Sequence, residues 1–366
     1  MKKTVFSRWW LLPSGILAAS ALFALTILVL QPTFVDRSFA AIAQRAPSGA
    51  ALDCSGPKAT DYACYQQRYQ DLVSDFGVNA AFTDLKDEYN KNEFVKGQCH
   101  QMTHVIGRAA VGLYGDLSGA YAHGDNFCWS GYYHGAMEAI VAKIGPDKIL
   151  TEASTICGDL AENEPYSFYH YNCVHGLGHG FMGIQDNELF ESLETCDTLN
   201  DEWERGSCYS GVFMENVMTQ YNSNRPSKYL KADQPLYPCT DVEDKYKTEC
   251  YKMQTSYALD TQGGDFSKVF DLCAGIEDEF QPMCYQSLGR DASGKSVSDV
   301  DETRDTCMLG EDYTARSNCI VGAVKDFISY YSDDTQANAL CESLDDKDLR
   351  DMCLQESEDY YKTLET

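Results

Sequence analysis

The chain has few basic residues and lacks motifs that mark several common enzyme classes. Acidic residues outnumber basic residues by 56 to 29, which gives a formal net charge of −27. A polyanion of this size repels nucleic acid, so nucleic-acid binding is disfavoured. The sequence contains no H-E-x-x-H and no G-x-S-x-G, which argues against the usual zinc proteases and against α/β-hydrolases.

No two of the cysteines form a C-x2-C pair, although the chain has 16 of them. The absence of this spacing argues against zinc ribbons, thioredoxin chemistry and c-type haem. In an exported protein so many cysteines favour disulfides, and their even number permits complete pairing.

The N-terminus predicts export. Residues 1–8 are basic, and residues 9–30 carry no charge. At about 1.5 Å per residue the uncharged stretch can cross a hydrocarbon core of about 30 Å. We therefore predict a cytoplasmic segment at 1–8, a single transmembrane signal-anchor at 9–30 and a linker at 31–60, with the rest of the chain outside the cytoplasm. The alternative is a signal peptide cleaved near residues 38–43.

Cysteines recur in pairs along the C-terminal half. The first members Cys239, Cys273, Cys307 and Cys341 lie 34 residues apart, a period typical of paired helices in a solenoid. Each has a partner 11 or 12 positions later, and an antiparallel helix hairpin brings two such positions within reach of a disulfide. The predicted local pairs are Cys239–Cys250, Cys273–Cys284, Cys307–Cys319 and Cys341–Cys353.

Earlier copies follow the same logic with more variation. They predict the pairs Cys54–Cys64, Cys157–Cys173 and Cys196–Cys208, and by elimination Cys99 pairs with Cys128. The predicted fold is an all-α solenoid of disulfide-stapled hairpins, with histidine-rich repeats at 61–185 and cysteine-paired repeats at 186–366. Its period resembles that of tetratricopeptide arrays, whose sequence signatures are absent, and this architectural analogy implies no function.

Two rows of residues run along the second helices of the predicted hairpins. Three positions after the second cysteine the residue is usually small, which indicates close helix packing: Gly131, Gly176, Gly211, Ser287 and Gly322. Six positions after it come His134, His179 and Met214, and charged residues follow further along. The copy that contains Cys99 falls one residue out of this register, with His104 five positions after the cysteine.

Five of the seven histidines cluster on three consecutive predicted helices. His100 and His104, and likewise His175 and His179, are spaced i, i+4 and would project from one helix face. Together with His134 they predict a metal centre, because neutral imidazoles one turn apart can share an ion. The alternative is a set of hydrogen-bonded imidazoles that fill glycine-lined gaps between helices.

The remaining two histidines, His123 and His170, are interpreted as structural or simply exposed. Copper is favoured over zinc and then iron, because Met214 would lie beside His179 in an oxidising compartment. A centre with two ions is an option, since five imidazoles exceed the needs of one. Glu138 and Glu215 are the best-placed carboxylates, either for acid–base catalysis or for supporting the ligands; ordinary surface acids are the alternative.

The leading functional hypothesis is a metal-binding protein of the cell envelope, extended to a metal-dependent oxidoreductase or, second, a hydrolase. The alternative is a non-catalytic adaptor whose helical surface binds a protein or peptide partner. Metal content of the purified protein distinguishes the two.

Overall fold

The computed structural model describes residues 52–128, 131–163, 165–222, 227–296 and 299–364. Leu52–Thr366 form one compact unit. The basic segment, the anchor and most of the linker predicted for residues 1–60 lie outside the described residues. Within the described part, no helix is both long and apolar enough to cross a membrane.

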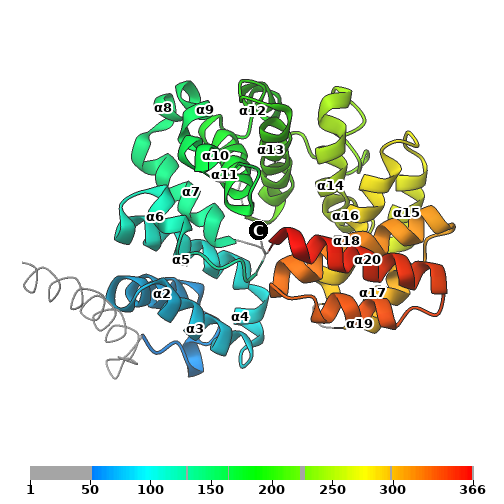
Figure 1. The fold of residues 1–366 in the computed structure, drawn as a ribbon, viewed down its shortest axis with the longest axis horizontal. Coiled ribbons are helices and arrows are strands. Elements are labelled where there is room, and N and C mark those ends of the chain that lie inside the picture. Colours follow the sequence, from blue (N-terminus) through cyan, green and yellow to red (C-terminus); the bar gives the residue numbers. More distant parts are fainter. Residues whose placement is uncertain (1–51, 129–130, 164, 223–226, 297–298, 365–366) are drawn as a thin grey trace, which may run out of the picture. The chain divides into compact units, whose positions relative to one another are not determined.

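The described residues form helices joined by short connections (Figure 1), and they contain no β-strand. The first half contains the following elements: η1 (Gly56–Lys58), α2 (Tyr62–Phe76), α3 (Val78–Tyr89), α4 (Glu93–Gly97), α5 (Cys99–Tyr114), α6 (Leu117–Tyr121), α7 (Gly131–Ile144), α8 (Pro146–Thr151), α9 (Ala153–Ile156), α10 (Gly158–Asn163) and α11 (Phe168–Ile184). The second half contains α12 (Leu189–Cys196), α13 (Glu202–Asn222), α14 (Asp244–Thr261), α15 (Phe266–Ala274), α16 (Gln281–Ser296), α17 (Val300–Cys307), α18 (Tyr313–Tyr331), α19 (Thr335–Glu342) and α20 (Lys347–Leu364). The predicted all-α class is confirmed for these residues.

The ends of the helices follow local sequence. Ser167 caps the N-terminus of α11, where its hydroxyl accepts a hydrogen bond from the backbone N–H of His170 at 3.1 Å; serine is a preferred N-cap residue. Gly115 caps the C-terminus of α5, and its φ of 90° lies in the left-handed region that favours glycine. These caps fix the lengths of two helices that carry histidines.

All eight predicted disulfides are present, and no cysteine is free. Seven bridge neighbouring segments of the chain, with Cα–Cα distances between 5.3 and 5.9 Å. The eighth, Cys99–Cys128, ties the start of α5 to the segment before α7. Each bridge closes a loop and so restricts the unfolded chain, which stabilises the fold by roughly 2–4 kcal/mol per bridge.

The long helices pack against one another in chain order. α5 contacts α7, α7 contacts α11, and α11 contacts α13; the series continues through α14, α16, α18 and α20. The buried residues between them are mainly aromatic and aliphatic side chains, with Tyr132, Phe181 and Phe327 among the largest.

The end of α18 returns to the beginning of the described chain. The Tyr330 hydroxyl donates to the Tyr89 hydroxyl at 2.7 Å, and the Cys128 N–H donates to the Tyr330 carbonyl at 3.3 Å. The Tyr330 ring also packs against Phe127. The segment before α7 is therefore held both by a disulfide and by a helix far along the sequence.

Candidate metal centre

Glycines allow the histidine-bearing helices to approach backbone to backbone. A Cβ atom at Gly135 of α7 would lie 2.1 Å from the His104 carbonyl oxygen, and one at Gly107 of α5 would lie 1.9 Å from the Tyr132 carbonyl oxygen. Real Cβ contacts are never that short, so both positions require glycine at this helix separation. The backbones of α5 and α7 are therefore in close contact at the turn of α5 that carries His104.

The contact between α11 and α13 also depends on glycines that let the two backbones approach closely. A Cβ atom at Gly211 would lie 2.0 Å from the His175 carbonyl oxygen, and one at Gly178 would lie 2.2 Å from the Cys208 carbonyl oxygen. Each i, i+4 histidine pair thus sits where two helices meet through glycine.

The five clustered histidines converge as the sequence predicts. His100, His104 and His134 can bring one ligand nitrogen each within 4.8 Å of one another, and so can His134, His175 and His179. His134 belongs to both groups, and its ring centroid lies between 4.9 and 5.5 Å from the centroids of the other four rings. Both groups of three could hold a metal ion.

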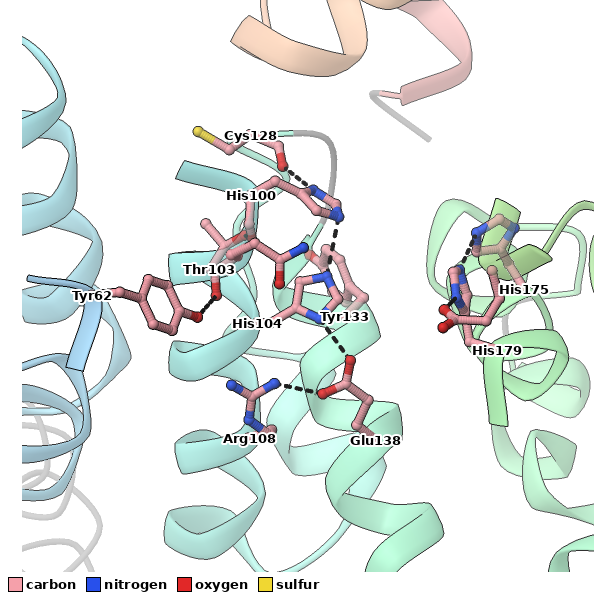
Figure 2. Close-up of polar contacts among 12 residues, drawn as sticks. Tyr62, His100, Thr103, His104, Arg108, Cys128, Tyr133, Glu138, His175 and His179 are labelled. Carbon is pink, nitrogen blue, oxygen red and sulfur yellow. Dashed lines mark hydrogen bonds and ion pairs between the residues drawn. The ribbon is translucent and has the colours of Figure 1, made fainter. Parts of the chain in front are cut away.

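The first pair is held by groups on α7 and in the segment before it (Figure 2). The His100 Nδ1–H donates to the Cys128 carbonyl at 2.9 Å, and the His104 Nδ1–H donates to the Glu138 carboxylate at 2.7 Å. Arg108 donates to the other oxygen of Glu138 at 2.5 Å. Both rings are therefore oriented through Nδ1, and their Nε2 atoms point toward one another.

The second pair is held by α13 in a closely similar way. The His179 Nδ1–H donates to Glu215 at 2.8 Å, and the His175 Nδ1–H donates to the Ser210 hydroxyl at 2.7 Å. The Ser210 hydroxyl in turn donates to the Ser207 carbonyl at 2.7 Å, so it accepts from His175. Again each Nδ1 is engaged, one with a carboxylate and one with a neutral oxygen.

These hydrogen bonds make the paired Nε2 atoms face one another as acceptors. The Nε2 atoms of His100 and His104 are 3.1 Å apart, and those of His175 and His179 are 3.2 Å apart. A neutral imidazole has one proton, and in each ring Nδ1 already holds it. Two lone pairs at this distance repel unless a proton or a metal cation lies between them. Nitrogens bound to tetrahedral zinc at about 2.0–2.1 Å are themselves about 3.3 Å apart, so both spacings suit a shared ion.

Burial disfavours a proton as the bridging cation at several of the rings. It lowers the pKa of His100 to about 3, with the neighbouring His104 contributing. Burial also lowers the pKa of His134 and His175 well below the ordinary range, and the adjacent imidazoles lower it further. Glu138 stays ionised: burial alone would raise its pKa, but His104 and Arg108 lower it to about 2. His100, His134 and His175 are therefore neutral, and the Glu138 carboxylate is anionic.

His134 differs from the other four histidines. It is 5% exposed, and its Nδ1 is buried without a hydrogen-bond partner among the described residues. An unpaired buried polar atom costs free energy, and in a histidine cluster such a nitrogen is suited to bind a metal ion.

Glu138 and Glu215 lie in the centre, each bonded to the Nδ1 of a histidine. This position supports metal ligands, and it also makes Glu138 a poor candidate for direct coordination because both of its oxygens are engaged. Met214 is partly buried on α13, next to Glu215. Its role as a ligand stays a prediction, as does catalysis by either glutamate.

His123 and His170 lie outside both groups. His123 is exposed, stacks on Tyr114 with a centroid distance of 4.1 Å, and donates from Nδ1 to the Gly119 carbonyl. His170 is buried; its Nε2 bonds Glu204 at 3.2 Å and its Nδ1 accepts from the Tyr166 N–H. Both nitrogens of His170 are satisfied, in agreement with a structural role.

Three other groups of the centre were not predicted from the sequence. Arg108 and Ser210 carry no motif, and the Cys128 carbonyl is a backbone group. Arg108 lies one helical turn beyond His104, a spacing that could have suggested a shared face. Ser210 and Cys128 are identified only by the contact between helices.

A third glycine-packed pair, α16–α18, has no histidines. A Cβ at Gly289 would lie 1.9 Å from the Cys319 carbonyl oxygen, and one at Gly322 would lie 1.9 Å from the Gln286 carbonyl oxygen. Arg290, six residues after Cys284, stands where His179 stands after Cys173, and it bonds Ser256 and Asp291. Close glycine packing of two helices therefore forms without imidazoles. Packing alone does not account for the histidines on α5, α7 and α11.

Two segments match the letter patterns of nucleotide-binding loops but are helical. Residues 289–296 read G-x-x-x-x-G-K-S and lie within α16, and residues 178–183 read G-x-G-x-x-G and lie within α11. Both patterns bind phosphate only on a loop that follows a strand. In this fold Gly178 and Gly289 instead provide helix contacts.

A cavity of about 860 Å³ adjoins the second pair. Tyr171 lines it, and the Tyr171 hydroxyl lies 3.4 Å from the His175 Nδ1. Trp203, Tyr209 and charged residues of both signs, including Lys252 and Glu249, form other parts of its wall.

No protein-family model, curated protein or solved structure matches this chain.

Proposed function

We propose that the chain is a metal-binding protein of the cell envelope, anchored by its N-terminal helix, with its histidine centre outside the cytoplasm. Copper is our first choice of metal, followed by zinc and then iron. We further propose that the helices form a solenoid with a period of about 34 residues, which places consecutive histidine-bearing helices side by side. The eight disulfides support an oxidising compartment.

The observation that carries this proposal is the pair of facing Nε2 atoms in each histidine pair. Their spacings of 3.1 and 3.2 Å, with every Nδ1 already donating, need a cation between them. Glu138 and Glu215 bond the Nδ1 atoms of His104 and His179, so with an ion bound at Nε2 they would complete a carboxylate–histidine–metal arrangement. The engaged state of Glu138 argues against iron bound by two histidines and one carboxylate, because the carboxylate is already used.

We base the proposal of redox or hydrolytic chemistry on the number of histidines in each group. Three histidines per group leave a coordination position open, as catalytic sites do, whereas structural zinc sites are closed by four protein ligands. A bound ion would supply Lewis-acid or one-electron chemistry there. Glu138 and Glu215 would hold the protons of His104 and His179 and keep those rings oriented; we favour an oxidoreductase over a hydrolase.

A non-catalytic adaptor is the second candidate. The cavity beside Tyr171, with aromatic side chains and charges of both signs, suits a peptide segment. This function needs no metal.

Elemental analysis of the purified, untagged full-length protein tests the proposal. We expect copper or zinc in the protein as isolated, and a fall in melting temperature after a chelator removes the ion. If no metal copurifies and neither copper, zinc nor iron raises the melting temperature, the histidine pairs hold protons instead, and the adaptor function takes precedence.

A further inference from the structure

The two histidine groups share a single residue, and that residue has both nitrogens to offer. His100, His104, His175 and His179 each use Nδ1 for a hydrogen bond to a protein oxygen, so each can give only Nε2 to a metal. His134 has no such bond at its buried Nδ1. Among the five rings it alone is in both groups and has an Nδ1 without a partner in the described structure.

We propose that the centre holds two divalent metal ions bridged by His134. One ion binds His100, His104 and one nitrogen of His134; the other binds His175, His179 and the second nitrogen of His134. The bridging ring gives up its remaining N–H proton to solvent as the second metal–nitrogen bond forms, and it becomes an imidazolate with one negative charge. This inference rests on the proposed metal-binding function and specifies how many ions the centre takes.

The carboxylates of the centre are divided between the two histidine groups. Glu138, which also pairs with Arg108, bonds His104 in the first group, and Glu215 bonds His179 in the second. Two divalent ions in a buried site repel each other strongly. An anionic ring directly between the two ions reduces that repulsion. His134 is the ring in that position, because it belongs to both histidine groups. The near-equal centroid distances from His134 to the two pairs are consistent with this role.

Copper(II) titration of the full-length protein tests the bridge. The protein is stripped with a chelator, loaded with copper(II) and desalted; copper per chain and the electron paramagnetic resonance signal are then measured. We expect two coppers per chain and far less than two spins per chain, because an imidazolate bridge couples the two spins antiferromagnetically. Saturation at one copper, or two coppers with two full spins, would overturn the proposal.

His134→Ala provides the matched variant, and His123→Ala is the control. Without the bridge, any copper held by the two remaining pairs should bind at least tenfold more weakly and show one full spin per copper. His123→Ala should keep the reduced signal of the parent, since His123 is exposed and outside both groups. The parent measurement does not depend on the variant's folding. A protein that binds no copper or zinc at all would also refute the proposed function, whereas binding of a single ion would refute only the bridge.

Discussion

Glu138 is the residue that best separates support of a ligand from catalysis. It holds the Nδ1 proton of His104 and is itself held by Arg108. Glu138→Gln keeps an acceptor oxygen but removes the charge, so we expect metal affinity to fall about 10–100-fold. Competition titration with a chromophoric chelator measures this change.

The exposed Glu194 of α12 provides a control for that substitution. Glu194→Gln should leave metal affinity unchanged. If Glu138 also transfers protons during turnover, Glu138→Gln should lower the rate even at saturating metal. An unchanged affinity would show that the contact with His104 does not tune the ion.

The buried imidazoles predict how the metal-free protein responds to acid. Burial lowers the pKa of His100 to about 3 and also lowers the pKa of His134 and of His175 well below the ordinary value. The unfolded chain therefore binds more protons than the folded chain between about pH 3 and 6.5. The free energy of unfolding should fall as the pH drops through that window, by up to about 1.4 kcal/mol per pH unit for each of these histidines.

Urea unfolding of chelator-treated protein at pH 7 and pH 5 measures that slope. His100→Asn removes one of the titrating groups and should flatten the average slope between these two pH values by about 1 kcal/mol per pH unit. A stability that is equal at the two pH values, or higher at pH 5, would contradict the neutral state of these rings.

At the residue scale the sequence predicted which histidines cluster but not the groups that hold their rings. The i, i+4 spacing and clustering of His100, His104, His175 and His179 follow from helix periodicity, which is a local property. Their Nδ1 partners lie 28 to 36 positions away in the chain. Such partners depend on the distance and rotation between packed helices, and sequence spacing does not give these quantities.

At the scale of the helices, glycine decides how closely histidine-bearing segments approach. Gly107→Ala would place a methyl group 1.9 Å from the Tyr132 carbonyl oxygen and push α5 away from α7. We expect a loss of about 1–3 kcal/mol in the free energy of unfolding. Metal affinity should fall as well, because the two helices carry ligands of the same group. Thermal unfolding with and without metal measures both effects.

Gly112 offers a matched control on the same helix. A Cβ at Gly112 meets nothing within 4 Å, and the residue is helical. Gly112→Ala should therefore raise stability by about 0.5–1 kcal/mol, because alanine is the better helix former. If both substitutions had the same effect, close packing at Gly107 would not matter.

The sequence anticipated only part of this glycine packing. The row three positions after the second cysteine predicted Gly131, Gly211 and Gly322, and all three make close contacts across helices. The partners Gly107, Gly135, Gly178 and Gly289 fall outside that row because facing helices meet at different heights. The hairpin disulfides were easier to predict, since a hairpin fixes its own geometry within about a dozen residues, whereas Cys99–Cys128 followed only by elimination.

At the scale of the whole molecule, the least predictable feature is the return of α18 to the start of the described chain. Tyr330 and Tyr89 bond across 241 positions of sequence. No periodic pattern marks such a contact, because it depends on the summed rotation of every helix between them. Yet it reaches the candidate metal centre: the Tyr330 carbonyl accepts from the Cys128 N–H, and the carbonyl of Cys128 orients His100.

The disulfides and the N-terminal sequence both predict that the protein is exported. All 16 cysteines are paired, and disulfides of this number form in oxidising compartments. Residues 9–30 are uncharged and follow a basic segment, the arrangement that keeps the N-terminus in the cytoplasm. A reporter enzyme that works only outside the cytoplasm, fused after residue 50, should therefore be active, and a cytoplasm-only reporter at the same position should be silent.

The full-length protein should fractionate with membranes and resist extraction by high salt. A soluble mature form beginning near Ala41 or Gln44 would show that the segment is a cleaved signal peptide, whereas activity of the cytoplasmic reporter would refute export itself.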